Sequence, residues 1–198
     1  MAAVTSNRLY IQGKRMTELS PHPTAPRLVP AAAADNATIQ NMARFYVYDM
    51  SRYCGARPGW ECPDDGLFVC IDLKKYFNDA DRAAFFIQVG DEKAGFVLVN
   101  KEGTTPDVDW NIGEFFVLAK FQNSGIGQQI AAQLFDRFPG VWEVHAMPDN
   151  VPAAKFWRNV IKKYAKSGMS EETKVVTDDN PKPHPMVVFR FTTLGGRN

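Results

Sequence analysis

The sequence predicts an α/β fold built on a single mixed sheet, and two observations carry that prediction. The run FFVLAKFQNSGIGQQIAAQLF, residues 115–135, combines an apolar strand, a short polar loop with two glycines and an amphipathic helix. Along the whole chain, segments follow one another in the order strand, helices, three strands, helix, strand, helix and two strands. A length of 198 residues, with 14 Phe and 4 Trp, is sufficient for one domain with a substantial core.

The N-terminal part of the chain predicts an extension, a strand and a long helix. Residues 1–24 end in the proline-rich SPHPTAP and are expected to form a flexible extension; an organelle-targeting segment is the alternative. The domain is expected to span residues 25–198 and to begin with APRLVPAA as its first strand. Residues 35–54 carry apolar side chains at helical spacing, with Asp35 or Asn36 as the N-cap.

The middle of the chain predicts a loop, a short helix and a hairpin. Residues 55–66 are rich in turn-forming residues, and DLKKYFNDADR (72–82) is short and amphipathic. RAAFFIQVG (82–90) and KAGFVLVNK (93–101) read as two strands joined by a tight turn at residues 90–92.

Further strands and helices follow in the C-terminal half. DVDWNIGEFFVL (107–118) is a third consecutive strand that leads into the glycine loop. VWEVHAM (141–147) is strand-like and precedes a helix that starts near Asn150. The chain is expected to end with a short strand at residues 174–177, a loop, and a strand MVVFRF at 186–191.

The glycine loop carries the main chemical signal. Gln122, Gly125 and Gly127 form a Q-x-x-G-x-G pattern where a strand meets a helix, so several backbone N–H groups and the positive end of the helix dipole face one point. Such a point suits a phosphate or pyrophosphate, although an ordinary tight turn has the same local pattern. Two familiar phosphate loops do not fit, because Gln128 stands where a P-loop has its lysine and Ile130 where a dinucleotide loop has its third small residue.

A second motif follows at a fixed distance. Asn150, Ala153, Phe156 and Trp157 form N-x-x-A-x-x-F-W on the next predicted helix. Together the two motifs resemble those of the GNAT superfamily of acyl-CoA-dependent N-acetyltransferases, as in its small bacterial-type single-domain members, over residues 84–192. The resemblance implies an α/β fold with a mixed, mostly antiparallel central sheet and helices on both faces.

The resemblance also implies acetyl-CoA as cosubstrate and a set of residues that bind it. The loop amides would hold the pyrophosphate, and an N–H of Val117 or Leu118 would stabilise the tetrahedral oxyanion. Asn150 would bond the pantetheine arm or cap its helix, and Phe156 would line the cofactor groove or pack in the core. The full set is Phe116, Val117, Leu118, Gln122, Asn123, Ser124, Gly125, Ile126, Gly127, Asn150 and Phe156.

Two residues are candidates for the base that deprotonates the amine. Glu114 lies on the strand before the glycine loop, where many members of the family carry such a glutamate; a solvated carboxylate is the alternative. His145 lies on the following strand, and an imidazole suits a base near neutral pH; a structural histidine is the alternative.

The family's usual acid is missing. Trp157 occupies the position that often carries a tyrosine, and an indole N–H donates a hydrogen bond but does not transfer a proton at this pH. Solvent or Tyr164, two helical turns on, would then protonate the leaving thiolate, unless Tyr164 is a packed helix residue.

Composition excludes several classes of function. A formal net charge of +1 gives no sign of nucleic-acid or membrane affinity, and no apolar stretch is long enough to span a bilayer. Cys54, Cys62 and Cys70 form no C-x-x-C pair and with the three histidines complete no zinc pattern, so no metal is expected. Three thiols suit a reduced, cytoplasmic protein.

We therefore expect an N-acetyltransferase in which a primary amine attacks acetyl-CoA directly in a ternary complex. A small-molecule acceptor is favoured because no acidic channel for a basic peptide is evident; a protein lysine or N-terminal amine is the alternative. A non-catalytic acyl-CoA-binding module and an atypical nucleotide-binding protein are further alternatives. Homodimers are common in the resembling family, so a homodimer is one expectation. Tyr48, Tyr53, Trp60 and Trp110 are candidates for the acceptor pocket.

Overall fold

The computed structural model describes residues 24–56, 59–68, 73–165, 167–177 and 183–193. The expected N-terminal extension, apart from Thr24, lies outside these residues, and so does Cys70.

One seven-stranded sheet organises the molecule, in the order β1-β2-β3-β4-β5-β7-β6. Its strands are β1 Arg27–Pro30, β2 Ala83–Val89, β3 Glu92–Asn100, β4 Trp110–Val117, β5 Gly140–Ala146, β6 Met169–Val176 and β7 His184–Thr193. Every neighbouring pair is antiparallel except β4 and β5, which run parallel. The predicted mixed, mostly antiparallel sheet is confirmed.

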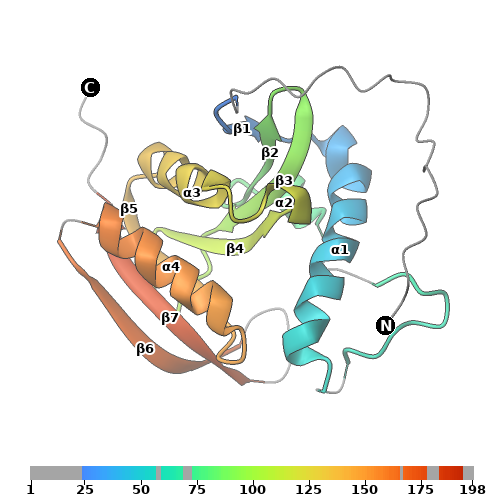
Figure 1. The fold of residues 1–198 in the computed structure, drawn as a ribbon. Coiled ribbons are helices and arrows are strands. Elements are labelled where there is room, and N and C mark those ends of the chain that lie inside the picture. Colours follow the sequence, from blue (N-terminus) through green and yellow to red (C-terminus); the bar gives the residue numbers. More distant parts are fainter. Residues whose placement is uncertain (1–23, 57–58, 69–72, 166, 178–182, 194–198) are drawn as a thin grey trace.

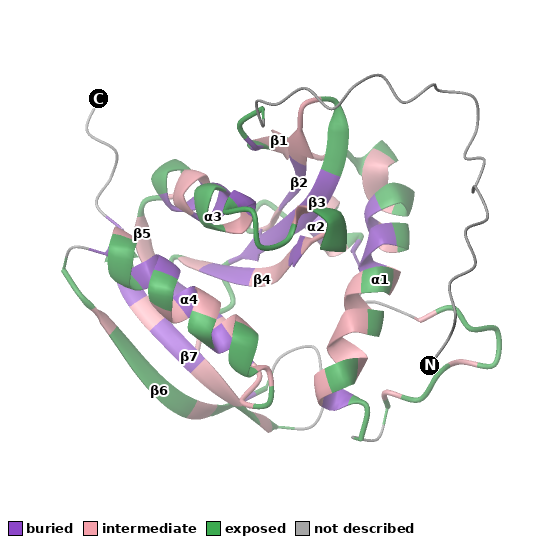
Figure 2. Ribbon diagram, viewed as in Figure 1, coloured by how far each residue is buried: buried purple, intermediate pink, exposed green. Residues whose placement is uncertain are grey.

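Helices cover both faces of the sheet (Figure 1). The helical elements are η1 Ala33–Asp35, α1 Asn36–Cys54, α2 Lys75–Asn78, η2 Ala119–Phe121, α3 Ile126–Arg137 and α4 Val151–Tyr164. The helices α3 and α4 pack on one face through residues such as Ile130 and Ile161, and α1 and α2 pack on the other through Ile39 and Tyr76. Figure 2 shows the buried residues gathered where these helices meet the sheet.

The central strand β3 serves both cores, because successive side chains of a strand point to opposite faces. Val97 and Val99 pack with α3 and α4, whereas Phe96 and Leu98 pack with α1 and α2. All four side chains are fully buried, which explains the continuous apolar run in the sequence.

The structure differs from the expectation at two points. Asp35 is the N-cap residue of α1, as expected, but its carboxylate accepts a hydrogen bond from the Ala32 N–H at 2.9 Å and makes no capping hydrogen bond to the helix. The short strand expected at residues 174–177 is part of the longer β6, which pairs with β7 along its whole length. Its residues are mostly exposed because β6 is the edge strand, so they lack an apolar pattern.

Gly95 allows β3 and β4 to approach each other closely at the end of their ladder. It pairs with Val117, and a Cβ at this position would lie 2.0 Å from the Phe116 carbonyl oxygen. Since that oxygen belongs to the backbone, a side chain at position 95 displaces β4 where the strand enters the glycine loop.

Replacing Gly95 with alanine is therefore expected to lower the free energy of unfolding by about 1 to 3 kcal/mol, the usual cost of overpacking. Urea unfolding followed by circular dichroism measures this change. The exposed Ser170→Ala on β6 is the control, with an expected change within about 0.5 kcal/mol. Equal stability of the two variants would show that the ladder tolerates the added methyl group.

Candidate active site

The site starts where β4 and β5 separate. They pair at Trp110 with Trp142, Asn111 with Glu143 and Ile112 with Val144, and the pairing ends there although both strands continue. The far end of β4 therefore has one edge bonded to β3 and one edge without a neighbouring strand, which we call the open edge.

Backbone geometry decides which amide faces the open edge. The Leu118 N–H donates to the Ala94 carbonyl oxygen at 2.8 Å and so is bonded to the β3 side. Bonding alternates along an antiparallel ladder, which directs the Val117 N–H to the open edge. Of the two N–H groups considered for the oxyanion, that of Leu118 is therefore bonded to β3, and that of Val117 faces the open edge. The N–H of Phe116, two residues before Leu118, also faces β3.

The glycine loop follows directly and leads into α3. Gly125 is the N-cap of α3 with a φ of 82°, a left-handed conformation that glycine adopts without steric cost, and no side chain caps the helix. Gln122 donates to the Val117 carbonyl oxygen at 2.8 Å, and the Ser124 hydroxyl donates to the Phe121 carbonyl oxygen at 2.5 Å. These side chains shape the loop, while the amides at the start of α3 face outward as an anion site requires.

Aromatic packing joins α3 to α4. A Cβ at Gly127 would lie 3.3 Å from the Phe156 ring, so the glycine gives this ring its place against α3. Phe115 of β4 packs against Phe156 and Trp157 with ring centroids 6.0 and 5.0 Å apart. Asn150 caps α4 by accepting from the Ala153 N–H at 3.1 Å, which supports the capping interpretation of this residue.

A polar row crosses the sheet beside the open edge. Asn100, Asn111, Glu143 and Arg190 are register neighbours on β3, β4, β5 and β7, so their side chains share one face of the sheet. This is the face of α1 and α2. The first three residues are buried, with Glu143 fully so.

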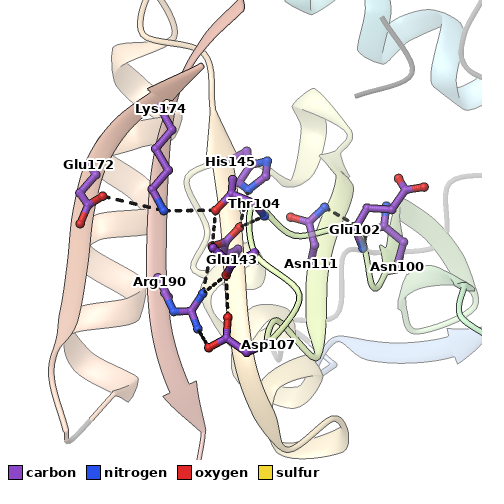
Figure 3. Close-up of polar contacts among 11 residues, drawn as sticks. Asn100, Glu102, Thr104, Asp107, Asn111, Glu143, His145, Glu172, Lys174 and Arg190 are labelled. Atoms are coloured by element: carbon purple, nitrogen blue, oxygen red, sulfur yellow. Dashed lines mark hydrogen bonds and ion pairs between the residues drawn. The ribbon is translucent and has the colours of Figure 1, made fainter. Parts of the chain in front are cut away.

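Glu143 collects most of the hydrogen bonds in this row (Figure 3). Its carboxylate accepts from the Thr104 N–H at 2.7 Å, the Thr104 hydroxyl at 2.8 Å and His145 Nε2 at 3.1 Å, and Arg190 Nη1 lies 3.4 Å away. Burial alone would raise the pKa of this carboxyl group, but the two Thr104 donors and His145 outweigh burial and hold the pKa below its ordinary value.

The ionised carboxylate fixes the orientation of His145. A carboxylate accepts hydrogen bonds and has none to donate, so His145 Nε2 is the donor to Glu143, and in the neutral imidazole the lone pair is then on Nδ1. The histidine is held in the tautomer and position that a base requires, at the first β5 position beyond the paired segment.

Arg190 of this row and Lys174 of the neighbouring strand β6 anchor the loop between β3 and β4. Arg190 donates to the Thr105 hydroxyl at 2.7 Å and to the Asp107 carboxylate at 2.5 Å, and Lys174 Nζ donates to the Thr104 hydroxyl at 3.2 Å. The loop thus covers Glu143 and forms one wall of the site.

A β-bulge places Glu114 on the same face. Leu98 pairs with Glu114 but Val99 pairs with Ile112, so Gly113 is an extra residue in β4. A Cβ at Gly113 would lie 2.4 Å from the Tyr76 hydroxyl, which explains the glycine. Glu114 and His145 both line one cleft of about 1610 Å³ that reaches Asn150 and Trp157.

Tyr164 requires a correction. Its hydroxyl donates to Asp136 of α3 at 2.5 Å, its ring packs on Phe135, and it is not among the residues that line the cleft. The packed-residue interpretation fits this position, and the role of acid does not.

Of the four aromatic residues expected to line a pocket, Trp60 does so, whereas Tyr48, Tyr53 and Trp110 do not.

Sequence reasoning missed Glu143 and its donors. Glu143 and His145 are two residues apart on the predicted strand, so their side chains point to the same face of the sheet. The carboxylate of Glu143, between the apolar Trp142 and Val144, was the one sign in the sequence that this face of the strand is polar.

Comparisons with known proteins agree with this geometry. The model of the acetyltransferase (GNAT) family matches residues 46–160, more than half of the chain. Among curated protein sequences, none matches this chain. None of the helices in the described ranges has the length and apolar character that crossing a bilayer requires.

Three solved structures illustrate the shared fold. An acetyltransferase from Thermus thermophilus is 20% identical, with a TM-score of 0.52, covering 85% of this chain and 97% of its own. The ribosomal-protein-S18-alanine N-acetyltransferase from Escherichia coli is 12% identical, with a TM-score of 0.53 and coverages of 88% and 98%. Aminoglycoside acetyltransferase AAC(6')-Ib in complex with coenzyme A is 14% identical, with a TM-score of 0.56 and coverages of 85% and 95%.

The buried carboxylate makes a prediction about stability. Glu143→Gln removes the charge that Thr104 and His145 stabilise, and should lower the free energy of unfolding at pH 7 by about 1 to 3 kcal/mol. Because the pKa of Glu143 is depressed in the folded state, its contribution is fully present above the ordinary value of 4.5 and is lost as the pH falls through the folded value.

Urea unfolding at pH 7 and at a series of pH values that extends well below 4.5, where the contribution is lost, tests this prediction. The difference between the parent and Glu143→Gln should shrink towards the acid end. Glu172→Gln on β6 is the control, because that carboxylate is 61% exposed and 3.8 Å from Lys174. A difference that stays constant with pH would mean that the charge of Glu143 does not contribute.

Proposed function

The chain belongs to the acetyltransferase (GNAT) family, and we propose that it transfers the acetyl group of acetyl-CoA to the primary amine of a small molecule. The observation that carries this proposal is that Glu114 and His145, the latter bonded to Glu143, line one cleft where β4 and β5 separate, and that β4 leads from there into the glycine loop at the uncapped start of α3.

Acetyl-CoA is proposed to bind along the open edge of β4. The pantetheine arm would pair with the backbone there, and the pyrophosphate would lie on the uncapped amides at the start of α3. The aminoglycoside acetyltransferase, which shares the fold, was solved in complex with coenzyme A, and this supports coenzyme A as the kind of ligand. The thioester carbonyl would then lie near Val117, whose N–H stabilises the oxyanion.

His145 is proposed as the base, with Glu114 as the second candidate. The amine nitrogen forms a bond to the acetyl carbon, its proton passes to His145 Nδ1, and the carbon–sulfur bond breaks to release coenzyme A as a thiolate. Glu143 stabilises the imidazolium so formed, since their charges are opposite.

The leaving group does not require an acid from the protein. A thiol has a pKa of about 8.5, so the thiolate leaves readily and takes its proton from solvent. This fits the cleft, where Trp157 provides an indole and Tyr164 is bonded elsewhere. The alternative of a non-catalytic acyl-CoA-binding module rests on Trp157 alone, and measured turnover of acetyl-CoA with an amine would exclude it.

Substitution of the loop glycine tests the cosubstrate. Gly125→Asp places a carboxylate where the pyrophosphate is expected, and should weaken acetyl-CoA binding by at least about tenfold, or about 1.4 kcal/mol. Isothermal titration calorimetry with acetyl-CoA measures this. Gly66→Asp is the matched control, since Gly66 also has a positive φ, of 70°, and open space around it. Equal weakening in both variants would contradict the assignment.

Substitution of the two candidate bases tests the mechanism. His145→Asn should lower kcat by about 100-fold or more while acetyl-CoA binding is retained, because general-base catalysis contributes about 10² to 10⁴. Glu114→Gln should lower kcat by a smaller factor than His145→Asn does. Release of the coenzyme A thiol reports the rate.

Tyr164→Phe is the control for this comparison, because its hydroxyl lies outside the cleft and its loss should leave kcat unchanged. A larger loss in Glu114→Gln than in His145→Asn would transfer the role of base to Glu114.

A further inference from the structure

Part of the cleft is left for the acceptor if acetyl-CoA takes the side of α4, where Asn150, Ala153 and Trp157 line it. This part is lined by α1, by Trp60 and by the neighbouring ends of β6 and β7. We call its apolar residues the acceptor wall: Tyr46, Val47, Met50, Trp60, Val176 and Met186. Thr177 and His184 line the same part of the cleft beside them.

The acceptor wall is apolar. It contains two aromatic rings and two thioethers, and a third thioether, that of Met147, lines the cleft beside it. Methionine side chains are flexible and polarisable, so they adapt to the shape of an apolar ligand. The wall is therefore suited to the hydrocarbon part of a substrate.

The described residues that line the cleft carry few charges, and these are balanced. Within the described residues that line it, the carboxylates are those of Glu102 and Glu114, and the ammonium groups are those of Lys75 and Lys101. Glu102 forms an ion pair with Arg82, and Lys101 lies 3.1 Å from Asp81. Among these described residues, negative charge is not in surplus for a ligand with several positive charges.

This balance discriminates between amines by their number of charges. One amino group fits beside Glu114 and His145, where it is deprotonated. Each further ammonium group would leave water for an apolar wall or for the neighbourhood of Lys75 and Lys101, which is costly without a partner.

Resting on the proposed function, we infer that the acceptor is an amphipathic amine with a single amino group on an apolar, aromatic or alkyl body. Its body packs on the acceptor wall and its nitrogen is directed to the open edge of β4. Polyamines, aminoglycosides and peptide amines belong to other substrate classes.

A panel of acceptors tests this inference with the full chain and acetyl-CoA. The panel contains 2-phenylethylamine and hexylamine as amphipathic monoamines, spermidine and kanamycin as polycations, and a short peptide with a free N-terminus. Thiol release gives kcat/KM, and mass spectrometry identifies the acetylated amine. We expect kcat/KM for a monoamine to exceed those for the polycations and the peptide by at least about tenfold.

The other outcomes separate the inference from the function on which it rests. Preference for kanamycin, spermidine or the peptide would overturn the inference and leave the acetyltransferase function standing. Calorimetry without acetyl-CoA binding would overturn both. Binding of acetyl-CoA without acetylation of any amine in the panel would overturn the inference and the proposed turnover.

A charge added to the acceptor wall provides a second test. Val47→Glu should reduce the ratio of kcat/KM for 2-phenylethylamine over spermidine by about tenfold, since it gives a polycation a carboxylate partner. Tyr48→Glu is the matched control, because Tyr48 is the next residue of α1, is 62% exposed and does not line the cleft. An unchanged ratio in a Val47→Glu variant that still binds acetyl-CoA would overturn the inference.

Discussion

The arrangement of the cleft depends on one buried charge, the carboxylate of Glu143. A fully buried carboxylate is unfavourable unless donors surround it, and here they come from three separate segments. Thr104 brings the loop between β3 and β4 over the sheet, Arg190 ties β7 to the same point, and His145 is oriented by it. Loss of the charge would therefore release a wall of the cleft and the position of the proposed base together.

The separation of β4 and β5 has a related local cause. Their pairing ends at Ile112 and Val144, and the next residue of β4 is the bulged Gly113. A bulge increases the local twist of a strand and re-aims the side chain that follows it. In β4 it directs Glu114 to the face of Glu143 and His145, and the strand beyond it runs beside β3 alone. One inserted residue thus accounts for both the open edge and the position of a second carboxylate.

The sequence predicts the parts of the site that lie in local patterns. The Q-x-x-G-x-G loop and the helix at Asn150 depend on backbone geometry, which particular residue types at fixed spacing specify. The polar row does not follow from any local pattern, because Glu143 meets Thr104 and Arg190 only through the order of strands in the sheet. Tyr164 shares a helical face with Trp157 but lies seven residues further on, about 10.5 Å along the axis, where it meets Asp136.

The charges in the cleft connect the proposed mechanism with the inferred acceptor. In the proposed mechanism, transfer of the amine proton to His145 would place an imidazolium beside the Glu143 carboxylate, and the opposite charges would stabilise each other. The proposed site would thus accept one proton from one amine. Among the described residues of the cleft, additional cations on the acceptor would find no comparable partner, because Glu102 is paired with Arg82 and the acceptor wall is apolar. The arrangement that favours deprotonation of a single amino group therefore also disfavours acceptors with several positive charges.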